Sequence, residues 1–123
     1  MAHHAARNIH LAICAIVAAL CATSSLAGPQ DGTPILRSVP GDKGKYFLLE
    51  ASRKGDVVYA LSKRIGVEYT TYTRTETNCK TRLMREIGSS DVSPQQIKNN
   101  PTKWFDLVQG SSKSDLAHFV CKW

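Results

Sequence analysis

Short apolar runs that alternate with charged turns characterise the middle of the chain. Residues 46–51 and 57–61 form two such runs, and the polar residues 53–56, which include a glycine, separate them. Two apolar runs joined in this way are typical of a β-hairpin. We therefore expect the first two strands of a sheet here.

The next stretch, residues 67–79, is rich in β-branched and aromatic residues, which favour strands. Its odd positions carry mostly threonine and end at Cys79, so that this cysteine lies on the less charged face. Such a threonine series could present hydroxyl groups to a ligand, but threonine is also a common residue of half-exposed strands, and we favour that interpretation because only one strand has the series. Residues 81–87 fit both a helix face and a strand, so their type stays open.

Helix signals gather in the last third of the chain. Ser93 precedes Pro94, with Gln96 three residues after the serine, which predicts a short capped helix that ends before Pro101. Another short apolar run follows at residues 104–108.

Ser112 and Asp115 open the clearest helix of the chain. Its apolar stripe consists of Leu116, Phe119, Val120 and Trp123. Strand-like runs come before residue 88 and this helix comes last. We therefore expect an α+β fold, a small antiparallel sheet of about four to five strands with the C-terminal helix packed on one face.

The first 27 residues have the order of a secretory signal peptide. Arg7 precedes the apolar run 11–21, and the small residues Ser25 and Ala27 follow. The apolar run is about half of the roughly 20 residues that a membrane-spanning helix needs. We expect cleavage near Ala27, which leaves no transmembrane segment and a periplasmic, cell-surface or secreted protein.

The mature chain then begins with residues 28–44, where three prolines and four glycines show no apolar period. This composition predicts a flexible segment, followed by a single α+β domain over residues 45–123. Cys79 and Cys121 are the cysteines that remain after cleavage. In an oxidising compartment such a pair is expected to form a disulfide, which would hold the helix to the sheet.

Basic residues give the chain a net charge of +6 and form three short clusters. The clusters are Arg53/Lys54, Lys63/Arg64 and Lys80/Arg82/Arg85. Positive patches attract nucleic acid, anionic lipid or sulfated polysaccharide, and in an exported protein nucleic acid is the least expected of these. We expect Lys80, Arg82 and Arg85 to hold an anionic ligand, with Lys63 and Arg64 as further candidates, although a solvated surface without a ligand is the alternative.

Candidate catalytic residues are few. His118 is the one histidine that remains after cleavage, and it points away from the apolar stripe, so we expect a surface residue. The chain has no phosphate-binding loop, no nucleophile motif and no spacing of zinc ligands. We therefore expect no enzyme, no cofactor and no metal.

Several short motifs resemble the surface-adhesin protein E family of bacterial envelope proteins. They comprise residues 77–82, Trp104 with residues 110–112, and Leu116 before Val120 and Cys121. The similarity covers roughly residues 45–122. It implies that Cys79 and Cys121 are bonded, that residues 80–87 form a strand, and that the protein binds host extracellular-matrix or serum proteins.

Two functions follow as expectations. The first is a non-enzymatic binding module of the cell envelope, an adhesin for a host matrix protein or a binder of other anionic ligands such as polysaccharides. The second is a small periplasmic structural or inhibitory protein without host contact.

Overall fold

A computed structural model describes residues 32–122 of the chain. Its elements are an antiparallel sheet, a 3₁₀ helix and one C-terminal α-helix. They are β1 (Thr33–Ile35), β2 (Lys45–Lys54), β3 (Val57–Ile65), β4 (Thr70–Asn78), β5 (Leu83–Ser90), η1 (Pro94–Gln96), β6 (Phe105–Asp106) and α1 (Ser112–Val120). The expected signal peptide, residues 1–27, lies outside the described residues.

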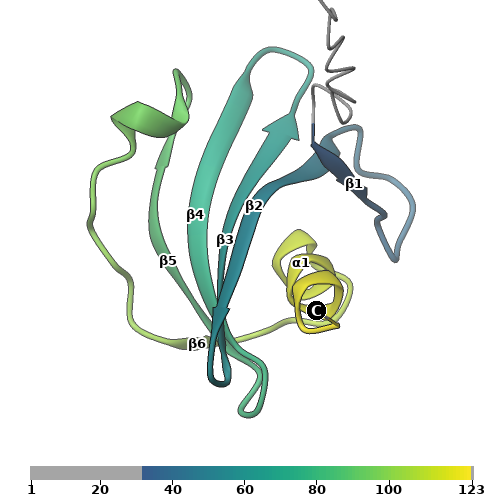
Figure 1. Cartoon of the computed structure of the whole chain (residues 1–123). Coiled ribbons are helices and arrows are strands. Elements are labelled where there is room, and N and C mark those ends of the chain that lie inside the picture. The colour runs from purple at the N-terminus through teal and green to yellow at the C-terminus, as the bar shows by residue number, and fades with distance from the viewer. Residues whose placement is uncertain (1–31, 123) are drawn as a thin grey trace, which may run out of the picture.

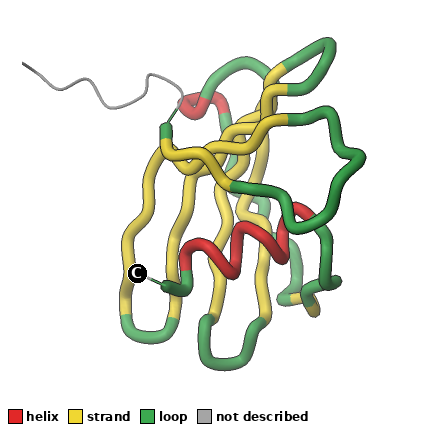
Figure 2. The backbone as a smooth tube through the Cα atoms, turned by 90° about the vertical axis from the view of Figure 1, so that its right-hand side faces the viewer, coloured by secondary structure: helices red, strands yellow, loops and turns green. Residues whose placement is uncertain are grey.

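The sheet is a meander, in which each strand pairs with the next one along the chain. It curves, and α1 lies against its concave face (Figure 1; Figure 2). The β2–β3 turn contains Gly55, whose φ of 60° is the left-handed conformation that a glycine adopts without strain. The expected α+β architecture with a helix on one face of an antiparallel sheet is confirmed.

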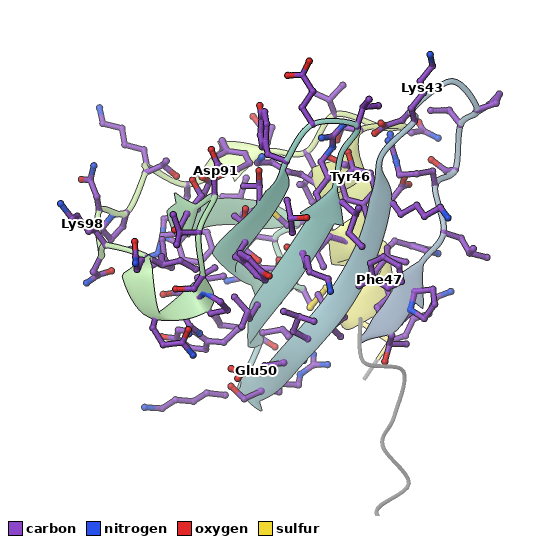
Figure 3. All side chains as sticks on the ribbon, turned by 90° about the horizontal axis from the view of Figure 1, so that it is seen from above. Lys43, Tyr46, Phe47, Glu50, Asp91 and Lys98 are labelled. Carbon is purple, nitrogen blue, oxygen red and sulfur yellow. A yellow bond between two sulfur atoms is a disulfide. The ribbon has the colours of Figure 1, made fainter. Side chains whose placement is uncertain are left out.

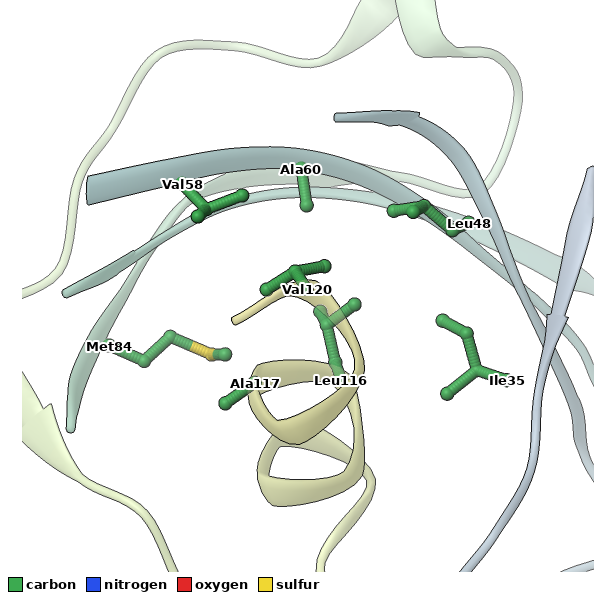
Figure 4. Close-up of a cluster of buried hydrophobic side chains, with 8 residues drawn as sticks. All are labelled: Ile35, Leu48, Val58, Ala60, Met84, Leu116, Ala117 and Val120. Carbon is green, nitrogen blue, oxygen red and sulfur yellow. The ribbon is translucent and has the colours of Figure 1, made fainter. Parts of the chain in front are cut away.

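The hydrophobic core fills the space between the concave face and α1. Alternate residues of each strand point to this side, and the helix contributes residues about one turn apart. The core residues are Ile35, Leu48, Val58, Ala60, Met84, Leu116, Ala117 and Val120 (Figure 4).

The threonines of β4 also face the helix. Thr77 lies opposite Val58, and Thr75 lies opposite Ala60, so that both point into the same space as these core residues. Thr75 is 2% exposed and Thr77 is fully buried. The half-exposed strand that we favoured is therefore wrong at these two positions, because α1 covers this face.

The sheet has six strands rather than four to five. One of the unexpected strands is β1, which pairs with β2 through residues 33–35, within the segment that we expected to be flexible. Arg37 ties this segment to the helix: it donates to the carboxylate of Asp115 (2.8 Å) and to the carbonyl of Gly110 (2.8 Å), and it pairs with Asp42.

Residues 81–87, for which the sequence left helix or strand open, contain a strand that begins at Leu83. The strand that the resemblance implies for residues 80–87 thus starts later, because residues 79–82 form a turn. The helix caps also differ from expectation. Ser111, not Ser112, accepts the capping hydrogen bond from the Ser114 N–H, and Ser93 makes no side-chain cap.

The expected disulfide between Cys79 and Cys121 is present, with 5.5 Å between the two Cα atoms. It joins the end of α1 to the β4–β5 turn. Within residues 32–122, no helix has the length and apolar character needed to span a membrane.

Candidate functional site

The β4–β5 turn presents two of the predicted ligand-binding residues. The side-chain oxygen of Asn78 accepts hydrogen bonds from the N–H groups of Lys80 and Thr81, each at 3.0 Å. The Arg82 N–H donates to the Asn78 carbonyl at 2.8 Å. An asparagine that binds the backbone two and three residues ahead fixes a turn locally. Lys80 and Arg82 are therefore held at the end of the sheet with both side chains exposed.

Arg82 has a φ of 61°, in the left-handed region that favours glycine. A non-glycine residue in this region costs about 1 to 2 kcal/mol. The turn thus carries an arginine where a glycine would fit more easily, and strain of this kind often accompanies function.

The β2–β3 turn lies beside the β4–β5 turn. The N–H of Cys79 donates to the carbonyl of Asp56 at 2.8 Å, so that the two turns touch at one end of the sheet, the lower end in Figure 1. The disulfide brings Cys121, and with it the next residue, to the same place. We call the resulting surface the basic tip; it consists of Arg53, Lys54, Lys80, Arg82 and Lys122.

All residues of the basic tip are exposed. Arg53 donates to the carbonyl of Gly55 at 3.0 Å, which keeps its guanidinium over the β2–β3 turn. Among residues 32–122, the carboxylates of the same region are those of Asp56 and Asp106, so that the described cations outnumber the described anions there. Such a concentration of like charge produces a positive potential that attracts anions over about 8 Å at physiological ionic strength.

Arg85 is not part of the basic tip. It lies on the outer face of β5, where it pairs with the carboxylate of Glu76 at 3.1 Å and stacks on Trp104 with 4.9 Å to the ring centre. The Glu76 side chain is 7% exposed, so this is a largely buried ion pair in which the arginine compensates a carboxylate.

Arg85 and Glu76 also line a hollow of about 570 Å³ on the outer face, which Asn99 and Pro101 border. The chain before β6 approaches the sheet closely here: a Cβ at Gly88 would lie 2.1 Å from the carbonyl oxygen of Lys98. Only a glycine permits this approach.

Lys63 and Arg64 point to opposite faces of β3. The ammonium of Lys63 lies 5.5 Å from the ring centre of Phe47 on the outer face. The Arg64 guanidinium lies on the concave side, where it donates to the Tyr46 hydroxyl (3.0 Å) and pairs with Asp42 (3.4 Å). The structure therefore brings Lys80 and Arg82 together, and it separates Arg85, Lys63 and Arg64 from them.

Sequence reasoning missed the rest of the basic tip. Arg53 and Lys54 form a cluster in the sequence, but only the pairing of the turns brings them beside Lys80. For Lys122 the sequence does contain a signal: a lysine follows each of the two bonded cysteines, so that the disulfide itself brings Lys80 and Lys122 together.

His118 is exposed on α1, as expected. In the part of the chain that the structure describes, no group of three or more His, Cys, Asp or Glu residues is placed to hold a metal ion. Comparison with models of known protein families, with curated proteins and with solved structures finds no match to this chain.

Proposed function

We propose that the chain is an exported, non-enzymatic binding module of the cell envelope that holds anionic ligands at its basic tip. The ligand is an anionic polysaccharide or the acidic face of a host extracellular-matrix protein. The observation that carries this proposal is that two turns and a disulfide bring together cations from three separate segments and hold them in place.

Rigid presentation of the cations supports binding as the function. Asn78 holds the backbone of the β4–β5 turn, and Cys121 anchors the turn to α1. A ligand therefore meets charges whose backbone positions are already fixed, which reduces the entropy lost on binding.

The alternative is a small periplasmic structural or inhibitory protein whose basic tip meets an anionic envelope component. The same cations support this function, so location separates the two. Brief protease treatment of intact cells is expected to remove an adhesin and to spare a periplasmic protein.

Binding to immobilised heparin at low and high salt tests the proposal. The variant Lys54→Glu/Lys80→Glu is expected to lose most of the binding, and high salt is expected to weaken binding of the unchanged protein steeply, because exposed charges are screened. The control Lys43→Glu/Lys98→Glu carries the same change in net charge at two exposed positions that are not part of the basic tip; both lysines are labelled in Figure 3. Equal losses in both variants would mean that net charge, not the basic tip, determines binding.

Two single variants sharpen the test. Arg82→Gly is expected to weaken heparin binding while the free energy of unfolding stays equal or rises, since glycine tolerates the φ of 61° at this position. Arg85→Met is expected to lower stability, because it leaves the carboxylate of Glu76 without its partner, and to leave heparin binding unchanged. Loss of binding in Arg85→Met with retained stability would move the site to the outer face.

A further inference from the structure

A cavity of about 280 Å³ opens on the concave face, at the end of the sheet away from the basic tip. We call it the concave cavity. Two tyrosines, two aliphatic side chains, two cations and a set of hydroxyl residues surround it. Its lining consists of Ile35, Tyr46, Ser62, Arg64, Tyr69, Thr71, Thr73, Thr75, Ser112, Lys113 and Leu116.

The charged residues of this lining are both cations, Arg64 and Lys113. Their acidic partners, Asp42 and Glu86, are not in the lining, and each lies 3.4 Å from its cation. The side chains of Arg64 and Lys113 are 40% and 45% exposed, so these ion pairs are weak and the cations can turn toward an anion. The walls of the concave cavity therefore favour a negatively charged group.

The first turn of α1 adds to this preference. Ser112 and Lys113 are the first two residues of the helix. Within residues 32–122, no hydrogen bond has the backbone N–H of Ser112 or Lys113 as its donor. The Ser114 N–H, by contrast, donates to the Ser111 side chain. Free N–H groups and the positive end of the helix dipole stabilise an anion at this position.

Thr75 is an independent observation that points to a ligand. It is a residue of the lining, its side chain is on the concave face because it lies opposite Ala60, it is 2% exposed, and its hydroxyl oxygen has no hydrogen-bond partner within the described residues. Buried hydroxyl groups are normally paired, because leaving one unpaired is unfavourable. A bound group that accepts a hydrogen bond from Thr75 would satisfy it.

Two residues of the lining, Ile35 and Leu116, are aliphatic and give the concave cavity an apolar wall. Ile35 and Leu116 lie next to each other on the β1 side of the helix (Figure 4). A purely inorganic anion would leave this wall without contact. The lining as a whole thus fits a molecule with a charged head and a short hydrocarbon body.

We propose that the concave cavity binds a small organic anion. Its anionic head group accepts hydrogen bonds from Thr75 and from the first turn of α1 and pairs with Lys113 or Arg64, and its apolar body packs against Ile35 and Leu116. This site is separate from the basic tip, and its occupation does not depend on the function proposed above.

Titration of the purified chain with hexanoate, followed by NMR chemical-shift changes, tests the proposal. Saturable shifts of Thr75, Ser112 and Lys113 signals are expected. Acetate, which lacks the apolar body, and 1-hexanol, which lacks the charge, are both expected to bind far more weakly. Equal binding of hexanoate and 1-hexanol, or no saturable shift with hexanoate, would overturn the proposal.

Two matched variants separate a binding role from a structural one. Thr75→Val removes the unpaired hydroxyl and keeps the shape of the side chain, so the fold is expected to persist while hexanoate binds about tenfold to a hundredfold more weakly, as for the loss of one hydrogen bond to a charged group. Thr77→Val makes the same change at a buried threonine whose hydroxyl is also unpaired but which is not part of the lining, and its affinity is expected to be unchanged. Equal affinities of Thr75→Val and Thr77→Val would overturn the proposal.

Two further variants test the role of the Lys113 charge and the independence of the concave cavity from the basic tip. Lys113→Gln is expected to weaken hexanoate binding, whereas Lys54→Glu/Lys80→Glu at the basic tip is expected to leave it unchanged. Loss of hexanoate binding in the variant of the basic tip alone would assign the anion to that surface and overturn the assignment to the concave cavity.

Discussion

The side chains around each arginine determine whether its charge stabilises the fold or is available to a ligand. Arg85 faces a nearly buried carboxylate and an aromatic ring, so its charge is used within the fold. Arg82 is exposed in a turn, and its backbone conformation is one that arginine adopts only at a cost. At the residue scale, therefore, Arg82 is available for a ligand and Arg85 is a structural residue.

Asp42 illustrates how such pairing affects the response to pH. Hydrogen bonds from the Tyr46 hydroxyl and the Gly44 N–H, together with Arg64, lower the pKa of this carboxyl from its ordinary value of 3.8 to about 2. For Asp115, burial favours a higher pKa, but the hydrogen bonds from Ser38 and Arg37 prevail and lower it. Both carboxylates connect the segment after β1 to the rest of the fold.

We predict that the protein loses stability in acid through these two groups. A pKa that is lower in the folded state stabilises the fold above the unfolded pKa, and this stabilisation disappears as the pH falls from about 4 toward 2. Asp42→Asn is expected to lower the free energy of unfolding at neutral pH and to flatten its decline in that range. Urea denaturation at a series of pH values measures the free energy of unfolding. Asp56→Asn is the control, because Asp56 lies outside the hydrogen-bond network of Asp42 and Asp115. If the free energy of unfolding of Asp42→Asn and of the unchanged protein declined in parallel with falling pH, the prediction would be wrong.

At the scale of elements, the disulfide is expected to contribute strongly to the stability of the fold. It closes a loop of 42 residues and connects the C-terminal end of α1 to the β4–β5 turn. Because the helix supplies Leu116, Ala117 and Val120 to the core, loosening it exposes the concave face.

We predict that Cys79→Ser/Cys121→Ser lowers the free energy of unfolding by about 2 to 4 kcal/mol. Amide hydrogen exchange is expected to increase first in α1 and in the β4–β5 turn, because these are the two elements that the bond joins. Mass spectrometry of the unchanged protein should find no free thiol at either position. Faster exchange confined to β1 and β2 would show that another element limits stability.

The longer elements could be predicted from the sequence, and the shortest could not. Alternation and a glycine-containing turn identified β2 and β3, and an apolar stripe identified α1. β1 and β6 have three and two residues, too few for a periodic pattern, and β1 contains Pro34. β1 is held by its pairing with β2 and by the contacts of Arg37, and β6 is held by its pairing with β5; such contacts are not visible in local sequence.

At the scale of the whole molecule, the candidate site was predictable only in part for the same reason. Lys80 and Arg82 were predicted together because they are close in sequence. Arg85 lies only three residues further on, but it sits in a strand, and its side chain is on the outer face of the sheet. Lys54 and Lys122 reach the same surface through the register of β2 and β3 and through the disulfide, two long-range features.

The final prediction concerns residues 32–44, the first segment of the described chain, which contacts the C-terminal helix α1. This segment supplies Ile35 to the core and to the concave cavity, and Arg37 to the carboxylate of Asp115 at the start of α1. A protein that begins at Lys45 would therefore expose Leu48 and Leu116 and leave Asp115 without its cation. By contrast, the basic tip lies at the other end of the sheet, beyond the reach of β1 (Figure 1).

We predict that the chain beginning at Lys45 is less stable by about 3 to 5 kcal/mol than the chain beginning at Gly28, from the lost burial of Ile35 and the lost hydrogen bonds of Arg37. Urea denaturation of the two proteins measures the difference, and Arg37→Met in the longer chain isolates the share of the arginine. The shorter protein is expected to lose hexanoate binding, because one apolar wall of the concave cavity is gone, and to keep heparin binding in conditions where it stays folded. Equal stability of the two proteins would show that β1 contributes nothing to the core, and retained hexanoate binding would place that ligand elsewhere.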